Sequence, residues 1–149
     1  MDKKDLITLL QKLLQREYLQ RDLYETYSYY LFGTDSPAIQ QHLKIHQAEE
    51  QIHIETLQRY LMGLGAKPLT SRLSIPGIEP LTLQAILEVN HEMEADTVRE
   101  YSEAIEAMEG NSQYTSIRVD MEDILKQEQE HSHDLIQWLG RWNDGSQKT

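Results

Sequence analysis

The sequence predicts an all-α protein, an antiparallel four-helix bundle with one long crossover between the second and third helices. Four long segments are rich in Leu, Gln, Glu and Ala, which favour helices, and none has a proline in its interior. Turn-forming residues separate these segments at 32–37, 63–80 and 110–112. The short first and third breaks favour helical hairpins, whereas the second is long enough to run the length of a bundle.

These breaks set the expected helix boundaries. We expect helices near residues 4–32, 37–62, 81–109 and 112–140, and a short tail over 141–149. Ser36 and Pro37 suit the N-cap and the first position of the second helix. Left-handed residues that end helices are expected at Gly33, Gly63, Gly110 and Gly140. A chain of 149 residues can form one domain with a proper core but not two, so residues 1–149 are interpreted as a single domain.

The first two expected helices each carry a glutamate in the middle of a largely apolar stripe. Steps of three and four residues place one such stripe on the inward face of each helix. The stripe of the first helix includes Glu17 and, seven residues later, Tyr24. The stripe of the second helix includes Glu50 and His53, which are three residues apart and therefore lie on the same face.

The third and fourth expected helices repeat this plan. The third carries Glu94 and, again seven residues later, Tyr101. The fourth carries Glu128 and His131 with the same Glu-x-x-His spacing. The chain is therefore interpreted as two helical hairpins of one plan, joined by the crossover.

A Glu-x-x-His pair is short enough to arise by chance, and such a pair can lie on a solvated surface. Glu88 with His91 and Glu130 with His133 also have this spacing, but neither pair falls on an inward stripe. The surface interpretation is weaker for the stripe residues, because a buried carboxylate without a partner costs several kcal/mol. Four carboxylates at one level of a core need a counter-charge.

Two divalent cations would supply that counter-charge. Four carboxylates and two neutral imidazoles around two such ions make a site without net charge, which makes its burial tolerable. The predicted metal ligands are Glu17, Glu50, His53, Glu94, Glu128 and His131. This mixture of oxygen donors and imidazoles suits iron, or alternatively manganese, better than zinc.

These motifs resemble those of the ferritin-like di-iron carboxylate proteins and, among them, the bacterioferritins. The similarity covers about residues 5–140 and rests on "REYLQRDLY", "EEQIH", "HEMEAD" and "ILKQEQEH". The resemblance implies a ferritin-like bundle with two iron ions per chain. It implies roles for six residues: terminal ligands Glu17 and Glu94, bridging ligands Glu50 and Glu128, and His53 and His131 on one iron each.

Other positions extend or limit this resemblance. It implies that Tyr24 hydrogen-bonds a ligand carboxylate of a neighbouring helix, and the internal repeat gives Tyr101 the mirrored position, where a core aromatic residue is the alternative. Both tyrosines are candidate catalytic residues. His46 and Glu49 could form an outer iron station, orient an imidazole or simply pack. Haem-binding bacterioferritins have a Met where this chain has Gln51, so haem is not expected.

The expected function is that of a ferroxidase, an oxidoreductase that binds two Fe²⁺ in the bundle core and oxidises them with O₂ or H₂O₂ for iron storage or detoxification. One alternative is a di-iron or di-manganese oxidoreductase without storage, which reduces peroxide or oxidises a substrate. Another is a metal-free helical interaction protein. The resemblance also leads us to expect a homo-oligomer, with a dimer as the smallest form and a cage as the largest.

The composition excludes several other classes. With 25 acidic and 14 basic residues and a net charge of -11, the chain lacks the positive surface that binds nucleic acid. The absence of cysteine excludes disulfides and thiolate metal sites. No apolar run has the length of a secretory signal or a membrane span, so we expect no membrane association and a cytoplasmic location.

Overall fold

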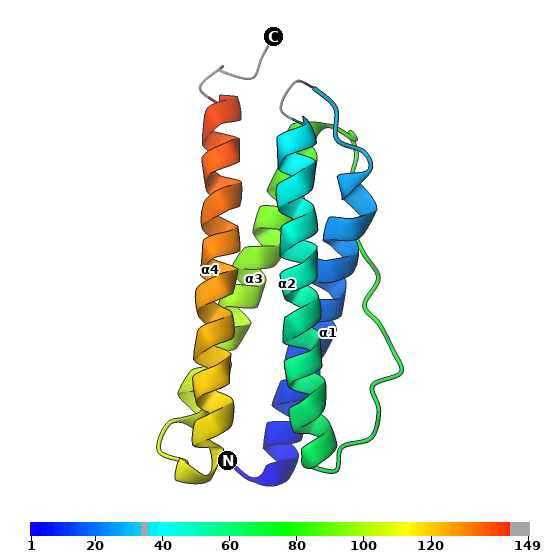
Figure 1. Ribbon diagram of the computed structural model, residues 1–149. Helices are drawn as coiled ribbons and strands as arrows, with labels where there is room; N and C mark the ends of the chain where they lie inside the picture. The colour runs from blue at the N-terminus through cyan, green and yellow to red at the C-terminus, as the bar shows by residue number, and fades with distance from the viewer. Residues whose placement is uncertain (34–35, 144–149) are drawn as a thin grey trace.

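Four α-helices lie side by side in the computed structural model, which describes residues 1–33 and 36–143, the last three by their backbone alone. They are α1 (Lys3–Ser28), α2 (Ser36–Gly63), α3 (Leu83–Met108) and α4 (Thr115–Asn143), and a short 3₁₀ helix, Ser112–Tyr114, precedes α4. In Figure 1, α2 and α4 lie in front of α3 and α1, and the crossover runs along the outside from the end of α2 to the start of α3. The predicted four-helix bundle with one long crossover is confirmed.

The N-terminal ends of the helices follow local capping. The side chain of Asp2 accepts a hydrogen bond from the Asp5 amide, and that of Thr82 accepts one from the Ala85 amide. These contacts satisfy amides in the first turns of α1 and α3, which no helical carbonyl can reach. Ser36, the expected N-cap, is instead the first residue of α2, and its hydroxyl donates to the Gly33 carbonyl at 2.6 Å.

The predicted left-handed conformation is wrong for two of the four glycines. Gly63 and Gly140 are both helical, whereas Gly33 and Gly110 do have the expected positive φ, 112° and 79°. At the end of α2 the left-handed residue is Gly65, with φ 77°. Amides beyond the end of α2 donate back to its last turn, from residue 66 to residue 61 and from 65 to 62, the pattern of a Schellman cap.

The ends of α1 and α4 also differ from expectation. α1 ends at Ser28, before the predicted boundary near residue 32, and the Ser28 carbonyl accepts a hydrogen bond from the Gln40 side chain of α2 at 2.9 Å. α4 continues to Asn143 because Gly140 does not turn the chain. Of the predicted tail, residues 144–149 lie outside the described residues.

The inward stripes form two apolar clusters with a polar layer between them. The larger cluster contains Leu10, Leu57, Met108 and Met121 among others, and the smaller contains Leu43, Leu87 and Leu135. Between these groups each helix contributes one fully buried glutamate to the core. Burial of the apolar side chains stabilises the bundle, and it also fixes the four glutamates at one level.

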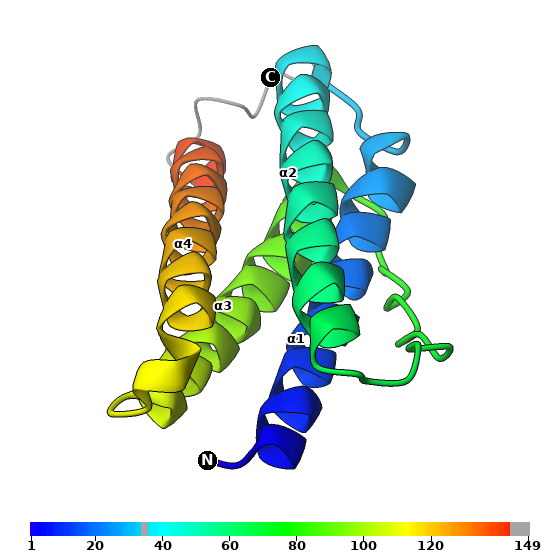
Figure 2. The same cartoon turned by 60° about the horizontal axis from the view of Figure 1, so that its bottom comes forward.

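The crossover covers α1. The hydroxyl of Tyr27 donates to the Pro76 carbonyl at 2.7 Å, and the guanidinium of Arg72 lies 3.6 Å from the centre of the Tyr18 ring. Figure 2 shows the same segment beside α1 from a second direction. Among the described helices, none has the length and apolar character needed to cross a membrane.

Candidate metal centre

Four glutamates, one from each helix, meet in the middle of the bundle. Glu17, Glu50, Glu94 and Glu128 all have 0% exposed surface. Each occupies the centre of a long helix, where the apolar residues on either side force its side chain into the core. The structure therefore brings together the four carboxylates that the stripes predicted.

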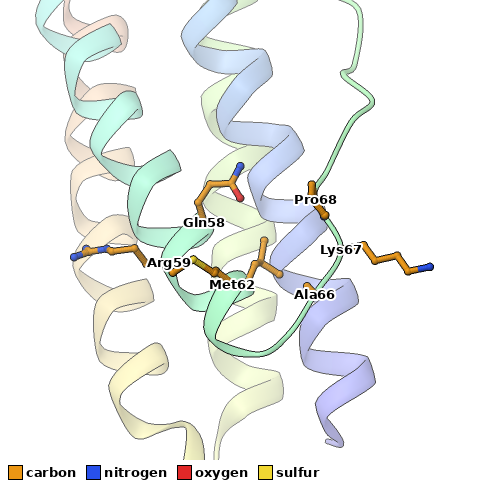
Figure 3. Close-up of a pocket in the computed structure, with 7 residues that line it drawn as sticks. Gln58, Arg59, Met62, Ala66, Lys67 and Pro68 are labelled. Atoms are coloured by element: carbon orange, nitrogen blue, oxygen red, sulfur yellow. The ribbon is translucent and has the colours of Figure 1, made fainter.

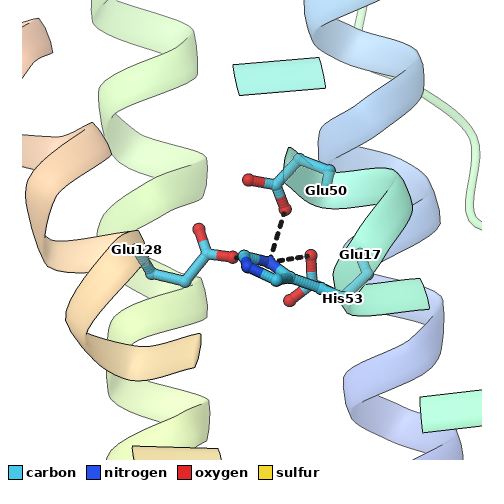
Figure 4. A group of neighbouring side chains, drawn as sticks. All are labelled: Glu17, Glu50, His53 and Glu128. Atoms are coloured by element: carbon cyan, nitrogen blue, oxygen red, sulfur yellow. Dashed lines mark ion pairs between the residues drawn. The ribbon is translucent and has the colours of Figure 1, made fainter. Parts of the chain in front are cut away.

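The first ligand group, here called the His53 group, contains Glu17, Glu50, His53 and Glu128 (Figure 4). Each residue offers one ligand atom, and these atoms all lie within 4.8 Å of one another. The Nδ1 atom of His53 lies 2.8 Å from Glu128 Oε1, 3.4 Å from Glu17 Oε2 and 3.6 Å from Glu50 Oε2. Three carboxylate oxygens and one imidazole nitrogen thus face a single point.

The second ligand group, the His131 group, contains Glu50, Glu94, Glu128 and His131. The Nδ1 atom of His131 lies 2.9 Å from Glu50 Oε1, 3.4 Å from Glu128 Oε2 and 3.5 Å from Glu94 Oε1. Glu50 and Glu128 belong to both groups, and each directs one oxygen toward each histidine. Both carboxylates are therefore placed so that each could offer one oxygen to a metal ion in either group.

Most donor atoms in these groups make no hydrogen bond among the described residues, and their close contacts are the ion pairs between glutamates and histidines given above. The atoms without a hydrogen bond are Glu17 Oε2, both carboxylate oxygens of Glu50 and Glu128, Glu94 Oε2, and the Nδ1 atoms of His53 and His131. Buried polar atoms in folded proteins are almost always hydrogen-bonded, because desolvation without a partner is costly. Oxygen and imidazole donors that converge in this state fit two divalent cations.

Two buried tyrosines hold the terminal carboxylates from opposite sides. Tyr101 of α3 donates to Glu17 Oε1 at 2.5 Å, and Tyr24 of α1 donates to Glu94 Oε1. The second contact is the one that the family resemblance implies, and the first is its mirror. Burial and the adjacent carboxylates raise the pKa of both phenols well above 10, so both remain hydrogen-bond donors. In each pair the other carboxylate oxygen stays available as a ligand.

The outer nitrogen of each histidine also has a partner. His53 Nε2 lies 2.5 Å from Gln127 Oε1, and His131 Nε2 lies 2.5 Å from Glu49 Oε2. Because both partners present an oxygen acceptor, Nε2 carries the proton and Nδ1 can offer its lone pair to a metal. The Glu-x-x-His spacing does not point to Gln127, although Gln127 precedes Glu128 as Glu49 precedes Glu50.

His46 lies against the His131 group. Its ring stacks on that of His131, with centroids 4.1 Å apart, and its Nε2 atom lies 3.2 Å from Asp134 Oδ2. Burial and the nearby His131 lower the pKa of His46 to about 4. His46 therefore contacts the His131 ring directly, but it is not a member of either ligand group.

Electrostatics within the cluster separate the pKa values of the glutamates. Burial and the charge of Glu17 raise the pKa of Glu50 to about 8 and that of Glu128 to about 7. Burial and the charge of Glu128 raise the pKa of Glu94 well above 4.5. Burial opposes the ionisation of Glu17, but contact with Glu50 and the charge of His53 lower its pKa to about 2. Without cations the cluster therefore retains protons on some of its carboxyls.

For the two imidazoles, the effect of the neighbouring carboxylates on the pKa outweighs the effect of burial. Burial lowers the pKa of His53, but the charge of Glu17 and the contact with Glu128 raise it overall. For His131, contacts with Glu128 and Glu49 outweigh burial in the same way. Cations that bind here must displace these protons, so metal binding will depend on pH.

The remaining Glu-x-x-His pairs do not join the cluster. Glu88, Glu130 and His133 are exposed, and His91 is half-buried. A pocket of about 360 Å³ lies where α2 meets the crossover, around Met62 (Figure 3), and none of the predicted site residues lines it. The candidate metal centre is therefore in the core and not in this surface pocket.

Comparisons with known proteins agree with the fold. Residues 7–144 match the ferritin-like domain family. A crystal structure of ferritin-like, diiron-carboxylate proteins from Bacillus anthracis str. Ames superposes with a TM-score of 0.85 and 25% sequence identity, covering 93% of this chain and 99% of that chain. A dodecameric thioferritin, the bacterioferritin-related protein from Bacteroides fragilis, gives a TM-score of 0.85 at 21% identity, covering 97% and 89%. A search of curated proteins gives no match.

Proposed function

The chain belongs to the ferritin-like domain family, and on this premise we propose that it is a ferroxidase that binds two Fe²⁺ in the bundle core and oxidises them with O₂ or H₂O₂, for iron storage or detoxification. The observation that supports this most strongly is the pair of ligand groups that share Glu50 and Glu128. Their shared carboxylates supply oxygens to two adjacent positions at once. A metal-free interaction protein would have no use for so many buried carboxylate and imidazole donors that converge on one another.

The protein's contribution to this reaction is to hold two Fe²⁺ close together. Glu17 and His53 would complete one position, and Glu94 and His131 the other. Each Fe²⁺ supplies one electron, so the pair supplies two. With two protons, these electrons convert one O₂ to H₂O₂, or one H₂O₂ to two waters. Two-metal sites with ions about 3.5–4 Å apart are suited to such paired transfers.

Tyr24 and Tyr101 would act as positioning residues. Each phenol donates to one oxygen of a terminal carboxylate and leaves the second oxygen directed toward the site. This restricts the rotation of Glu94 and Glu17, so less conformational freedom is lost when a metal binds.

The burial of the site favours a small oxidant over an organic substrate. All four carboxylates have 0% exposed surface, and the two histidines have 2%. A substrate larger than O₂ or H₂O₂ would have to displace packed helices to reach both metal positions, which costs contact energy in a close-packed core. Peroxide reduction without storage remains the alternative that differs only in the fate of the iron.

A pair of variants tests the proposed site. Glu128→Ala removes a shared ligand and should abolish rapid Fe²⁺ oxidation, measured by stopped-flow absorbance. Glu130→Ala removes an exposed glutamate of the same helix and should leave the rate nearly unchanged. Metal analysis of protein loaded with Fe²⁺ without oxidant should give about two irons per chain. Equal losses in the two variants, or no bound iron, would contradict the proposal.

We also propose a homo-oligomer. The bacterioferritin-related neighbour from Bacteroides fragilis is described as dodecameric, and it shares the fold of this chain. Storage requires a closed shell around the mineral, whereas oxidation alone requires only the bundle. The size of the assembly therefore separates storage from peroxide reduction.

A further inference from the structure

The two ligand groups differ in what holds their imidazoles. The outer nitrogen of His131 faces a carboxylate, Glu49 Oε2, at 2.5 Å, whereas that of His53 faces a neutral amide oxygen, Gln127 Oε1, also at 2.5 Å. Glu49 and Gln127 occupy matching positions of the internal repeat, each immediately before a shared glutamate. The two halves of the site therefore match in geometry at this contact but differ in charge.

A carboxylate behind a metal-bound imidazole makes that imidazole a stronger ligand than an amide does. The negative charge stabilises the positive charge that the metal induces on the ring N–H, and such outer partners typically change metal affinity by about 10- to 100-fold. The Glu49 side chain is 33% exposed, so solvent screens part of its charge without removing it. The ion in the His131 group should therefore be held more tightly.

Packing also favours tighter binding of an ion in the His131 group than in the His53 group. The His46 ring stacks on His131 at 4.1 Å with an interplanar angle of 24°, which restricts the ring before any metal binds. His53 instead borders a pocket of about 240 Å³ between α2 and α4, which Gln127 also lines. The His53 ring thus forms part of the wall of a surface pocket, whereas the His131 ring packs against another side chain.

We propose that the two metal positions differ in affinity: the His131 group binds the first ion, and the His53 group binds the second, more weakly held ion beside Gln127. This inference rests on the proposed di-iron site. Glu49 and Gln127 are the positioning residues that set this order.

The order of loading is tested with Mn²⁺ as a redox-quiet substitute for Fe²⁺. Apo protein is crystallised with one equivalent of Mn²⁺ per chain, the ion is located by anomalous scattering, and calorimetry measures both affinities. We expect the ion in the His131 group and two affinities that differ by about tenfold or more. Equal occupancy, or an ion in the His53 group, would overturn the inference alone. If no Mn²⁺ or Fe²⁺ binds, the proposed function is wrong as well.

Exchange of the two partners gives a sharper test. Glu49→Gln should weaken the first Mn²⁺ affinity by about 10- to 100-fold, Gln127→Glu should strengthen the second, and the double variant should reverse which group fills first. The controls Glu130→Gln and Gln129→Glu make the same charge changes at exposed positions of α4. Reversed loading is a gain that misfolding cannot produce. A double variant that still loads the His131 group first would contradict the inference.

Discussion

Glu50 and Glu128 show at the scale of single residues why the centre is unstable without cations. Both carboxyls are fully buried, and the negative charge of Glu17 adds to the cost of ionising them. Their pKa values rise to about 8 and about 7, so the folded apo protein binds protons that the unfolded chain has already released. The free energy of unfolding therefore decreases as these protons are lost.

The first prediction concerns the pH dependence of stability. A raised folded-state pKa gives stabilisation that is complete below the unfolded value near 4.5 and disappears as pH rises through the folded values, here up to about 8. The raised pKa values of His53 and His131 act in the same direction above pH 6.5. Glu17 acts oppositely as pH falls from 4.5 toward 2. The lowered pKa of His46, about 4, also acts oppositely up to pH 6.5, but it opposes several raised carboxyl pKa values. We expect the melting temperature of the apo protein to fall between pH 5 and pH 8, measured by calorimetry.

The second prediction is that Mn²⁺ restores the stability that the apo protein loses as pH rises. The ions replace the bound protons and bind only the native arrangement, so they should raise the melting temperature by several degrees, and more at pH 7.5 than at pH 5. Mg²⁺, which prefers water and oxygen ligands to imidazole, serves as the control. A larger shift at pH 5 than at pH 7.5 would show that protons and metal do not compete for these side chains.

The third prediction replaces the four carboxylates by amides. The combined variant Glu17→Gln, Glu50→Gln, Glu94→Gln and Glu128→Gln fills a similar volume without mutual repulsion, so its apo form should melt higher than the wild-type apo protein. It should gain almost nothing from Mn²⁺. A variant that loses stability and still responds to metal would show that these glutamates are not the inward cluster.

At the scale of elements, the helix ends depend on which glycines must adopt a positive φ. Gly110 does so, with φ 79°, and turns the chain between α3 and the 3₁₀ helix. Gly140 does not, because α4 continues past it to Asn143. Residue 110 therefore favours glycine because of its positive φ, whereas residue 140 has no such requirement.

The fourth prediction follows from this difference. Gly140→Ala should raise the free energy of unfolding by about 0.5 kcal/mol, because alanine is the better helix former and nothing lies within 4 Å of the added methyl group. Gly110→Ala should lower it by about 1 kcal/mol, because a side chain is strained at this φ. Urea denaturation of the two variants measures both effects, and the same sign for both would contradict the assignment of the helix end.

At the scale of the whole molecule, the surface around Gln51 bears on assembly and haem. The Gln51 side chain accepts a hydrogen bond from Arg21 at 2.9 Å, at the position where the resemblance places a haem-ligating Met. An amide offers iron no soft thioether ligand. The fifth prediction is that protein made in haem-replete cells shows no stoichiometric haem absorption; a haem peak with protein ligation would contradict it, and Gln51→Met is the variant to compare.

Light scattering on the iron-loaded protein measures the assembly itself. We expect a homo-oligomer, and a closed shell that retains far more than two irons per chain would support storage. A small oligomer that holds only about two irons per chain would instead support peroxide reduction. A monomer would contradict the proposed oligomer.

The sequence by itself determined the fold class and the members of the candidate site. Glycine and proline residues in the turns separated four helices. The spacing of apolar residues by three and four placed Glu17, Glu50, Glu94 and Glu128 on the four stripes that face the core. The repeat located both histidines and both tyrosines. These features depend on the spacing of residues along one helix, which the 3.6-residue turn fixes without reference to the rest of the chain.

Only the tertiary structure decided which side chains meet across helices. The contacts of Tyr101 with Glu17, and of His131 with Glu49, join residues far apart in the chain, and their partners depend on how the helices are rotated and shifted against one another. Packing also decided that the left-handed turn after α2 falls on Gly65 rather than on the expected glycine. Helical periodicity assigns a residue to a face, but the contacts between faces are set by close packing of the whole core.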